Sequence, residues 1–447
     1  MKKIFKKFRF SLIFVVTFFK KHQKLLLLGF LLGVLSFLVL PRLGGKVFSK
    51  NIERIGFVGK YTYDKLPLEI QQMISEGLTS ISSDGHINPQ LAESWEINKE
   101  GKEYIFTLKQ NIFWHDGKLV KAQDINYNFS DVTTTALDGK RVKFELKEPF
   151  SPFLSVVAQP VFKKGLIGTG EYKVAKIKRN GEIVEKLLLI PKKDKSKQKI
   201  EIKFYPTEEA ARMAFKLGEV DIIREITHPG ELVSWQNIKI TPEVKYNRFV
   251  AVFFNTGDPK LENKSIRQAL AYAIQKKWPN RALTPINPHS WAYNPNVKPY
   301  NFDLENAKKL LEKSKENEQQ LKEIELSTIP SLLEIAENIK KDWETLGILC
   351  KVKVVNTWEG SFQAILAIQE VPLDPDQYVF WHSTQQLNIT KYKSPKIDKL
   401  LEEGRKTFNQ EKRKEIYQDF QKSLIEDAPA AFLFHPTIYT LSRISRI

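Results

Sequence analysis

The stretch IELSTIPSLLEIAENIKKDWETLGILCKVKVV, residues 324–355, decides the fold class. Ile324–Thr328 predicts a strand, Leu332–Gly347 predicts a helix that ends at its glycine, and Ile348–Val355 predicts a second strand. Two strands joined through a helix lie parallel in one sheet, because the helix carries the chain back to the starting edge. The sequence therefore predicts an α/β fold.

Further helices and one long apolar strand surround this unit in the C-terminal half. The strand RFVAVFFNT, Arg248–Thr256, is apolar almost throughout, which is typical of a strand in the centre of a sheet. Helices are predicted at Ser265–Lys277, Asp303–Lys315, Pro395–Lys406 and Gln410–Glu426.

A second set of strands and helices precedes Arg248. Strands are predicted at Tyr104–Leu108, Arg141–Lys147 and Lys199–Tyr205, and helices at Ala122–Phe129 and Thr207–Gly218. Two α/β sets on one chain predict two lobes with a cleft between them, where ligand sites are common. We place the junction at Asn255 and Thr256, directly after the apolar strand.

The charge of the chain is large but unevenly distributed. The 447 residues include 70 Lys and Arg against 52 Asp and Glu, a net charge of +18 that invites a nucleic-acid interpretation. Residues 1–46 contain ten of these basic residues and no acidic one, so more than half of the surplus lies in this segment. The charge therefore indicates membrane topology and anionic lipid headgroups rather than nucleic acid.

Residues 1–46 predict a basic segment with a transmembrane helix at about 25–41. The run 25–40 is apolar except for one serine and spans roughly 24 Å as a helix, while the flanking Lys24 and Arg42 can reach the two interfaces. The positive-inside rule keeps the N-terminus in the cytoplasm and exports the main domain. A cleaved signal peptide is the alternative, but residues 42–50 offer no A-x-A cleavage site, so we favour a single-pass signal anchor.

The sequence contains none of the common catalytic, phosphate-binding or metal-binding motifs. Its seven histidines are scattered and never spaced as helix-borne zinc ligands, and the sequence 115–117 (His-Asp-Gly) favours a turn over a catalytic dyad. Cys350 is the only cysteine, which excludes an intrachain disulfide. We expect no catalytic residue, no metal site and no cofactor.

Several motifs along the chain together resemble one family. LAESWEINKEGKEYIFTLKQNIFWHDGKLVKAQDINYNF, residues 91–129, looks like its signature, and further matches follow in order at 148–154, 168–174, 215–222 and 253–274, and from WHSTQ to SPKIDKLLEEG. The family is that of the extracytoplasmic solute-binding proteins of peptide-type ABC transporters, family 5, the oligopeptide- and nickel-binding group. The resemblance covers about residues 53–440.

The resemblance implies a bilobed, periplasmic-binding-protein-like fold of type II, similar to cluster C, in which hinge closure traps the ligand. Lobe one is expected at 47–255, with a family-specific insert at about 76–160, and lobe two at 256–436. Residues 437–447 are expected to return to lobe one. Relatives usually continue well past Ile447, so this return segment is expected to be reduced or truncated.

The resemblance also implies where the ligand binds. Trp358 resembles a tryptophan of peptide-binding relatives and is expected either to contact the ligand or to pack between the lobes. Relatives bind the peptide ammonium through an aspartate shortly before an acidic-Pro pair, but that position falls near Val371 here. The residues that can replace the aspartate, or that lie close by, are Glu370, Asp374, Asp376, Trp381 and His382. Asn255 and Thr256 are the hinge candidates.

The leading hypothesis is a monomeric, membrane-anchored binding protein that is not an enzyme. It would deliver peptides to an ABC permease and its ATPase subunits. A lipidated N-terminal cysteine, usual in relatives from single-membrane bacteria, is impossible here, so the transmembrane helix would replace it. The alternatives are another solute (a nickel chelate, an oligosaccharide or an opine), an exported hydrolase, or a DNA-binding protein.

Overall fold

The computed structural model describes residue 22 and residues 52–194, 196–315, 321–356 and 361–444. Residues 54–196 and 200–447 form one compact unit. The predicted transmembrane helix at 25–41 and Trp358 lie outside the described residues. In the part of the chain that the structure describes, none of the helices combines the length and the apolar character needed to cross a membrane.

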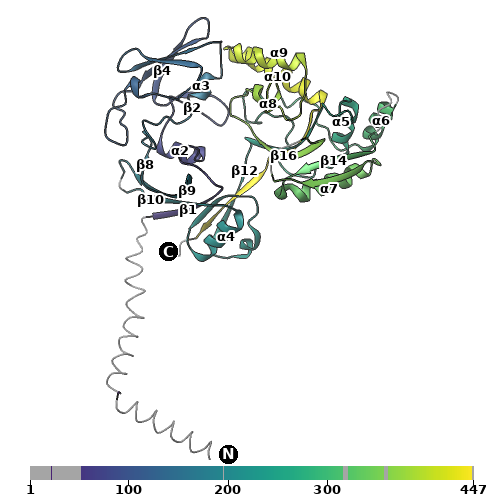
Figure 1. Ribbon diagram of the computed structural model, residues 1–447, viewed down its shortest axis with the longest axis horizontal. Helices are drawn as coiled ribbons and strands as arrows, with labels where there is room; N and C mark the ends of the chain where they lie inside the picture. The colour runs from purple at the N-terminus through teal and green to yellow at the C-terminus, as the bar shows by residue number, and fades with distance from the viewer. Residues whose placement is uncertain (1–21, 23–51, 195, 316–320, 357–360, 445–447) are drawn as a thin grey trace, which may run out of the picture. The chain divides into compact units, whose positions relative to one another are not determined.

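A seven-stranded mixed sheet forms the body of the first lobe (Figure 1). β1 and β11 run parallel in its centre, and α2 (Leu68–Ile74) and α4 (Glu208–Leu217) pack on it through buried apolar residues. The strands lie side by side in the order β12 (Ile238–Val244), β18 (Thr437–Arg443), β11 (Ile222–Ile226), β1 (Ile52–Val58), β10 (Lys199–Tyr205), β9 (Ile183–Pro191) and β8 (Tyr172–Asn180).

The α4 helix begins and ends as the sequence predicts. The Thr207 side chain accepts a hydrogen bond from the Ala210 amide, and Gly218 closes the helix in the left-handed conformation with φ of 76°.

The insert forms a small layer of its own beside this sheet. Its four antiparallel strands lie in the order β4 (Ala92–Ile97), β5 (Glu103–Leu108), β7 (Arg141–Leu146) and β6 (Val132–Ala136). The hairpin of β2 (Thr79–Ile81) and β3 (Ile87–Pro89) and the short helix α3 (Phe153–Val156) complete the layer. Alternate residues of β5 point into an aromatic core, as the period-two pattern predicts.

The helix predicted at Ala122–Phe129 is wrong beyond its first turn. The structure has a single 3₁₀ turn at Ala122–Asp124, and the chain then continues without regular structure. Ile125, Tyr127 and Phe129 pack against the core of the insert, and Asn128 between them has φ of 55°. Inward packing of alternate residues is incompatible with a helix, and the residues after Gln123 are weak helix formers.

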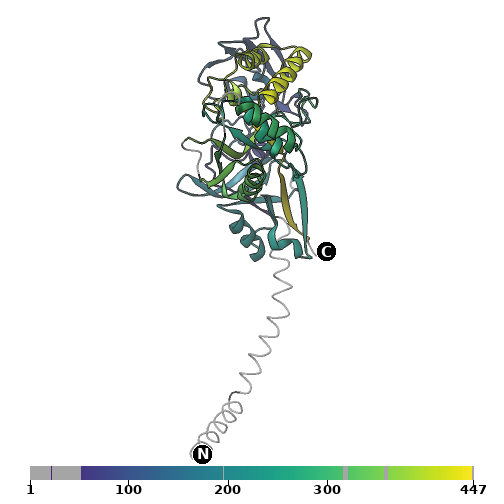
Figure 2. The same ribbon diagram turned by 90° about the vertical axis from the view of Figure 1, so that its right-hand side faces the viewer.

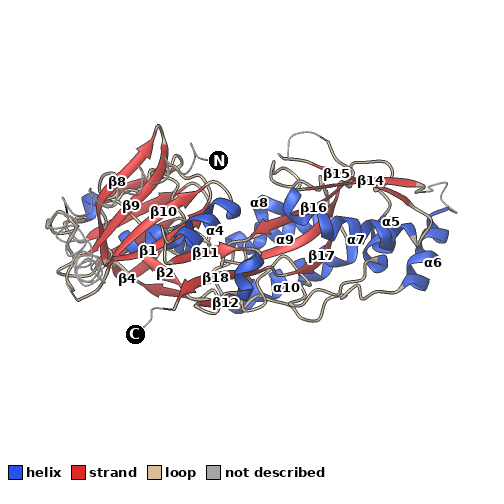
Figure 3. Cartoon of the chain, turned by 90° about the horizontal axis from the view of Figure 1, so that it is seen from below, coloured by secondary structure: helices blue, strands red, loops and turns tan. Residues whose placement is uncertain are grey.

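A five-stranded sheet forms the second lobe (Figure 3). Its order is β15 (Leu349–Val354), β14 (Glu323–Thr328), β16 (Ala364–Glu370), β13 (Arg248–Phe254) and β17 (Ala430–Phe434). β14 and β15 pair in parallel through α7 (Leu333–Glu344), which confirms the strand–helix–strand unit. β13 lies between two neighbours, and six of its residues are buried, as its apolar sequence predicts.

Five further helices surround this sheet. They are α5 (Lys264–Ala273), α6 (Leu304–Lys315), α8 (Tyr378–Trp381), α9 (Pro395–Lys406) and α10 (Gln410–Asp427). α9 and α10 lie at the end of the second lobe that faces the insert, as two perpendicular views show (Figure 1 and Figure 2). There the Ser151 amide donates to the Arg405 carbonyl over 2.7 Å.

The chain crosses between the two large sheets twice, at adjacent places. The first crossing is residues 245–247, between β12 and β13, and the second is residues 435–436, between β17 and β18. The Lys245 amide donates to the Pro436 carbonyl over 2.9 Å, and His435 Nδ1 lies 2.8 Å from the Arg248 carbonyl oxygen. After the second crossing, β18 pairs antiparallel with β11 and β12 of the first lobe.

These crossings correct the predicted lobe boundary. β13 belongs to the second sheet, so the first lobe ends near residue 244 and not at 255. Asn255 and Thr256 therefore lie inside the second lobe, away from the crossings. The Asn255 side-chain amide donates to the Phe362 carbonyl, and the Thr256 backbone amide donates to the Thr390 carbonyl. The predicted boundary was wrong because the apolar sequence of a strand indicates that the strand is buried, but it does not indicate to which sheet the strand belongs.

Because a carbonyl only accepts hydrogen bonds, Nδ1 of His435 carries the proton and donates to Arg248. His435 is only 3% exposed, and burial lowers the pKa of its ring. Nearby His289 lowers this pKa further, whereas the hydrogen bond to Arg248 raises it, and the net shift is downward. The folded protein therefore keeps His435 neutral at a pH where the unfolded chain, with a histidine pKa of about 6.5, is protonated.

We expect the free energy of unfolding to fall as the pH drops below about 6.5, with a contribution from His435 of at most about 1.4 kcal/mol per pH unit. His435→Gln removes the titrating imidazole and should remove this contribution, which denaturant unfolding between about pH 5 and pH 7 would measure. His228→Gln, at an exposed histidine, is the control and should retain the wild-type dependence. An identical pH dependence in wild type and His435→Gln would contradict the assignment.

Candidate ligand-binding site

A cavity of about 660 Å³ lies between the two large sheets, within the range typical of small-molecule sites. The first lobe contributes the end of β1, the start of α2 and the middle of β11. The second lobe contributes the start of β13, the end of β16 and the residues that follow it. Among the side chains that line it are Phe57, Tyr61, Leu68, Glu225, Arg248, Glu370, Val371 and Leu373.

Arg248 connects the two walls of this cavity. Its Nε donates to Glu370 Oε1 over 3.0 Å, and its Nη2 donates to Glu225 Oε2 over 3.2 Å. Glu370 ends β16 of the second lobe and Glu225 lies on β11 of the first, so one guanidinium joins carboxylates of both lobes. Burial by itself lowers the pKa of Arg248, but the two carboxylates outweigh it and the pKa is raised.

Glu225 reaches the cavity because β11 is distorted at this point. The pairing with β18 shifts register between Ile223 and Ile226, and Glu225 has φ of 57°, a conformation rare for residues other than glycine. A bulge of this kind redirects a side chain that regular alternation would place elsewhere. The backbone irregularity therefore coincides with the residue that supplies a carboxylate to the cavity.

The cavity wall carries more acidic than basic side chains. Glu69, Glu225 and Glu370 line it with two cations, Lys245 and Arg248. Lys245 Nζ lies 3.7 Å from Glu225 Oε1, and Glu69 is ion-paired with Arg224. Apolar side chains of both lobes line the rest. This arrangement suits a ligand that carries an ammonium group together with a carboxylate or an apolar part.

A second cavity of about 350 Å³ continues from the first. Leu68, Gln72, Pro372 and Leu373 line both, so the two spaces adjoin along α2. The second space runs on toward the insert, where Ser155 of α3 lines it. The combined space is therefore elongated and touches both lobes and the insert.

Of the predicted binding residues that the structure describes, Glu370 is the one that lines the main cavity. Asp374 is buried and accepts two hydrogen bonds from Arg413, over 2.7 and 3.0 Å, and one from Ser155 Oγ over 3.1 Å. Asp376 accepts from Arg405 Nε and Nη2, over 3.0 and 2.8 Å. Both aspartates therefore hold the loop after β16 in place instead of facing the cavity.

Trp381 and His382 lie within the second lobe. The Trp381 ring is 1% exposed and packs 6.3 Å from the ring of Phe253. His382 is also buried, stacks on Tyr378 at 4.1 Å, and its Nε2 lies 3.3 Å from Glu402 Oε1. These contacts pack the two side chains against their neighbours and fix the orientation of their rings.

Sequence reasoning missed Arg248, Glu225 and Lys245. A charge at the first residue of an apolar strand, as at Arg248, marks the end of a buried segment. Glu225 had no comparable signal, because the bulge that redirects it depends on the pairing with β18.

Among the described residues, few side chains are placed to bind a metal ion or to act as a nucleophile. Across the described ranges, no three His, Cys, Asp or Glu side chains gather closely enough to hold a metal ion. Cys350 is buried in β15, and burial raises the pKa of its thiol to about 12, so the thiol stays protonated.

Two lobes connected by adjacent chain crossings, with a charged cavity between them, define the class of bilobed solute-binding proteins. The model of the bacterial extracellular solute-binding proteins, family 5 middle region, matches residues 86–388. The chain therefore belongs to this family, as the series of sequence motifs predicted, and its relatives are substrate-binding proteins of ABC transporters rather than enzymes.

Individual relatives are distant but cover most of the chain. The dipeptide-binding protein of Escherichia coli (strain K12) is 23% identical in an alignment that covers 86% of each chain. NikZ from Campylobacter jejuni in complex with Ni(L-His) has a TM-score of 0.74 at 23% identity and covers 89% of this chain and 94% of its own. AppA from Bacillus subtilis in complex with a nonapeptide has a TM-score of 0.69 at 19% identity, over 88% and 94%.

Substitution of Trp381 distinguishes a role in core packing from a role in ligand contact. We expect Trp381→Ala to lower the free energy of unfolding by about 3–5 kcal/mol, because it opens a cavity in the core. Trp235→Ala, at a tryptophan that is 38% exposed, should cost less than about 1 kcal/mol. Denaturant unfolding measures both values. An unchanged stability with a strong loss of ligand affinity would instead place Trp381 in the binding site.

Proposed function

We propose that the protein captures peptides in the cavity between its lobes and delivers them to the permease of an ABC transporter. The observation that carries the proposal is the group of Glu225, Arg248 and Glu370, in which carboxylates of both lobes border one cavity. A ligand ammonium bound between the two carboxylates would interact with both lobes at once. Such a ligand would favour the closed arrangement by its differential affinity for it.

The charges and the shape of the site favour a zwitterion with an extended body. Glu225 and Glu370 would receive the α-ammonium, and Lys245 or Arg248 would receive a carboxylate. The adjoining space along α2 leaves room for further residues, as an extended peptide requires. The description of the E. coli relative as a dipeptide-binding protein supports the same solute class.

A nickel chelate of an amino acid is the second candidate. The likeness to NikZ in complex with Ni(L-His) favours it, since free histidine carries the same ammonium and carboxylate groups as a peptide. The peptide hypothesis has the advantage that an elongated space would remain largely empty around a single amino-acid chelate.

We also propose that the protein is a single-pass membrane protein whose main domain lies outside the cytoplasm. The apolar run at 25–40 and the ten basic residues of 1–46 support this topology. The anchor would keep the binding domain close to its permease, in the role that a lipid has in other relatives.

Ligand analysis tests the solute class. We expect mass spectrometry of the purified full-length chain to detect short peptides, and calorimetry to show saturable peptide binding. Glu370→Gln should weaken this binding at least about tenfold, because it removes a carboxylate from the site. Glu337→Gln, at a partly exposed glutamate of α7 that lines none of the cavity, is the matched control and should bind like wild type.

No co-purified peptide and no thermal shift with a peptide library would contradict peptide as the ligand. A thermal shift with nickel and histidine together, but with neither alone, would support the chelate.

The anchor predicts a separate result. The full-length chain should remain in the membrane after alkaline carbonate extraction and dissolve only in detergent, as judged by immunoblotting of the fractions. A variant that lacks residues 1–46 should appear in the soluble fraction of an extracytoplasmic extract when it carries a cleavable signal instead. Release of the intact chain by carbonate alone would show that the segment does not span the bilayer.

A further inference from the structure

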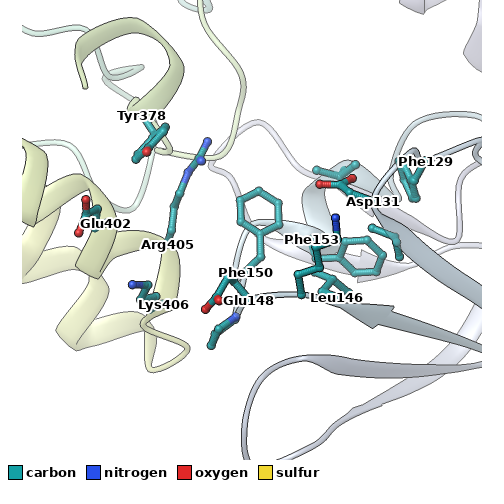
Figure 4. A pocket seen from close by; sticks show the side chains of 14 residues that line it. Phe129, Asp131, Leu146, Glu148, Phe150, Phe153, Tyr378, Glu402, Arg405 and Lys406 are labelled. Atoms are coloured by element: carbon teal, nitrogen blue, oxygen red, sulfur yellow. The ribbon is translucent and has the colours of Figure 1, made fainter. Parts of the chain in front are cut away.

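A third cavity, of about 650 Å³, lies where the insert meets the second lobe (Figure 4). The insert contributes apolar side chains, among them Phe129, Val132, Phe150 and Phe153, and the second lobe contributes Tyr378 of α8 with charged residues of α9. The cavity shares no lining residue with the two spaces between the large sheets. It is therefore distinct from the candidate peptide site and independent of the proposed function.

The floor of this cavity is aromatic. The Phe129 and Phe153 rings lie 5.9 Å apart, and the Arg405 guanidinium lies over two rings, 3.8 Å from the centroid of Tyr378 and 5.2 Å from that of Phe150. Figure 4 shows Arg405 and Tyr378 facing the ring of Phe150 across the space. Rings and a stacked guanidinium provide flat surfaces on which an aromatic group can pack.

The walls are held in place before any ligand arrives. Asp376 fixes Arg405 through both its Nε and Nη2, and the Ser151 hydroxyl donates to the Gly404 carbonyl over 3.1 Å. The Tyr104 hydroxyl donates to the Phe150 carbonyl over 2.8 Å. A site whose walls are already positioned loses less entropy when it binds a ligand.

The rim carries charges of both signs that lack partners. Four charged residues at the rim are exposed: Asp131, Lys147, Glu148 and Lys406. Among the described residues, none of the four forms an ion pair or a side-chain hydrogen bond. The Arg405 guanidinium, by contrast, is committed to Asp376. Free carboxylates suit a ligand ammonium, and free lysines suit a ligand carboxylate.

We propose that this cavity is a second binding site, for a small zwitterion with an aromatic side chain, of the size of an amino acid or a dipeptide. The aromatic group packs on the floor between Phe150 and Phe153. The ammonium group faces Glu148, and the carboxylate faces Lys406, which lies beside Glu148 in Figure 4.

L-Tryptophan is the probe, and its binding to the full-length protein is measured by calorimetry. We expect saturable binding that weakens at least about tenfold in Val132→Trp, because the larger side chain fills the cavity from β6. Thr133→Trp is the matched control: it adds the same side chain one residue further along β6, where the residue is exposed and lines none of the cavity. It should bind within about twofold of wild type, as should Glu370→Gln in the candidate peptide site.

Two analogues test the charges. Tryptamine lacks the carboxylate and indole-3-propionate lacks the ammonium, and each should bind at least about tenfold more weakly than L-tryptophan. If Val132→Trp unfolds, the double variant Asp131→Asn with Glu148→Gln replaces it and should lose at least about fivefold in affinity.

Three results would overturn the proposal. They are the absence of saturable binding of L-tryptophan to the wild type, equal binding to wild type and the folded cavity variant, and loss of binding in Glu370→Gln. The last result would place the probe in the cavity between the large sheets. Failure of peptide binding alone would refute the proposed function, but it would not contradict the proposal of this second binding site.

Discussion

The close approach of the two chain crossings is the constraint on which the rest of the structure depends. The backbone passes from the first sheet to the second at residues 245–247 and returns at 435–436, and the Lys245 amide joins the two crossings by a hydrogen bond to Pro436. Because both connections lie at one place, the sheets are tied along a single line and can open elsewhere. The cavity between the lobes borders this line, since Lys245 and Arg248 line it.

Arg248 connects the second chain crossing to the cavity between the lobes. Its backbone carbonyl accepts the hydrogen bond from His435, and its side chain reaches the carboxylates of Glu225 and Glu370. A rotation about the crossings would change the distance between those carboxylates, because they belong to different lobes. Electrostatic balance in the cavity is therefore linked to lobe separation, which is the property that a trapping mechanism requires.

Local patterns predicted much of the fold, and they failed where a distant contact decides the conformation. The period-two pattern of Tyr104–Leu108, the caps of α4 and the helix before Gly347 are encoded within a few residues, so they could be identified from the sequence. Ala122–Phe129 is predicted as a helix, but its aromatic side chains pack into the insert and extend the chain. The binding candidates Asp374 and Asp376 lie in the loop after β16, and Arg413 and Arg405, which neutralise them, come from distant segments.

The sequence by itself determined the α/β class, the two sets of elements and the family, because periodicity, capping residues and ordered motifs are local properties. Only the tertiary structure decided which sheet receives the apolar strand β13, where the crossings lie, and which carboxylates face the cavity. These features depend on strand pairing between segments far apart in the chain, such as β11 with β18. A buried strand satisfies its hydrophobic pattern in either sheet, so the choice is made by packing and hydrogen-bond registers that a linear pattern does not contain.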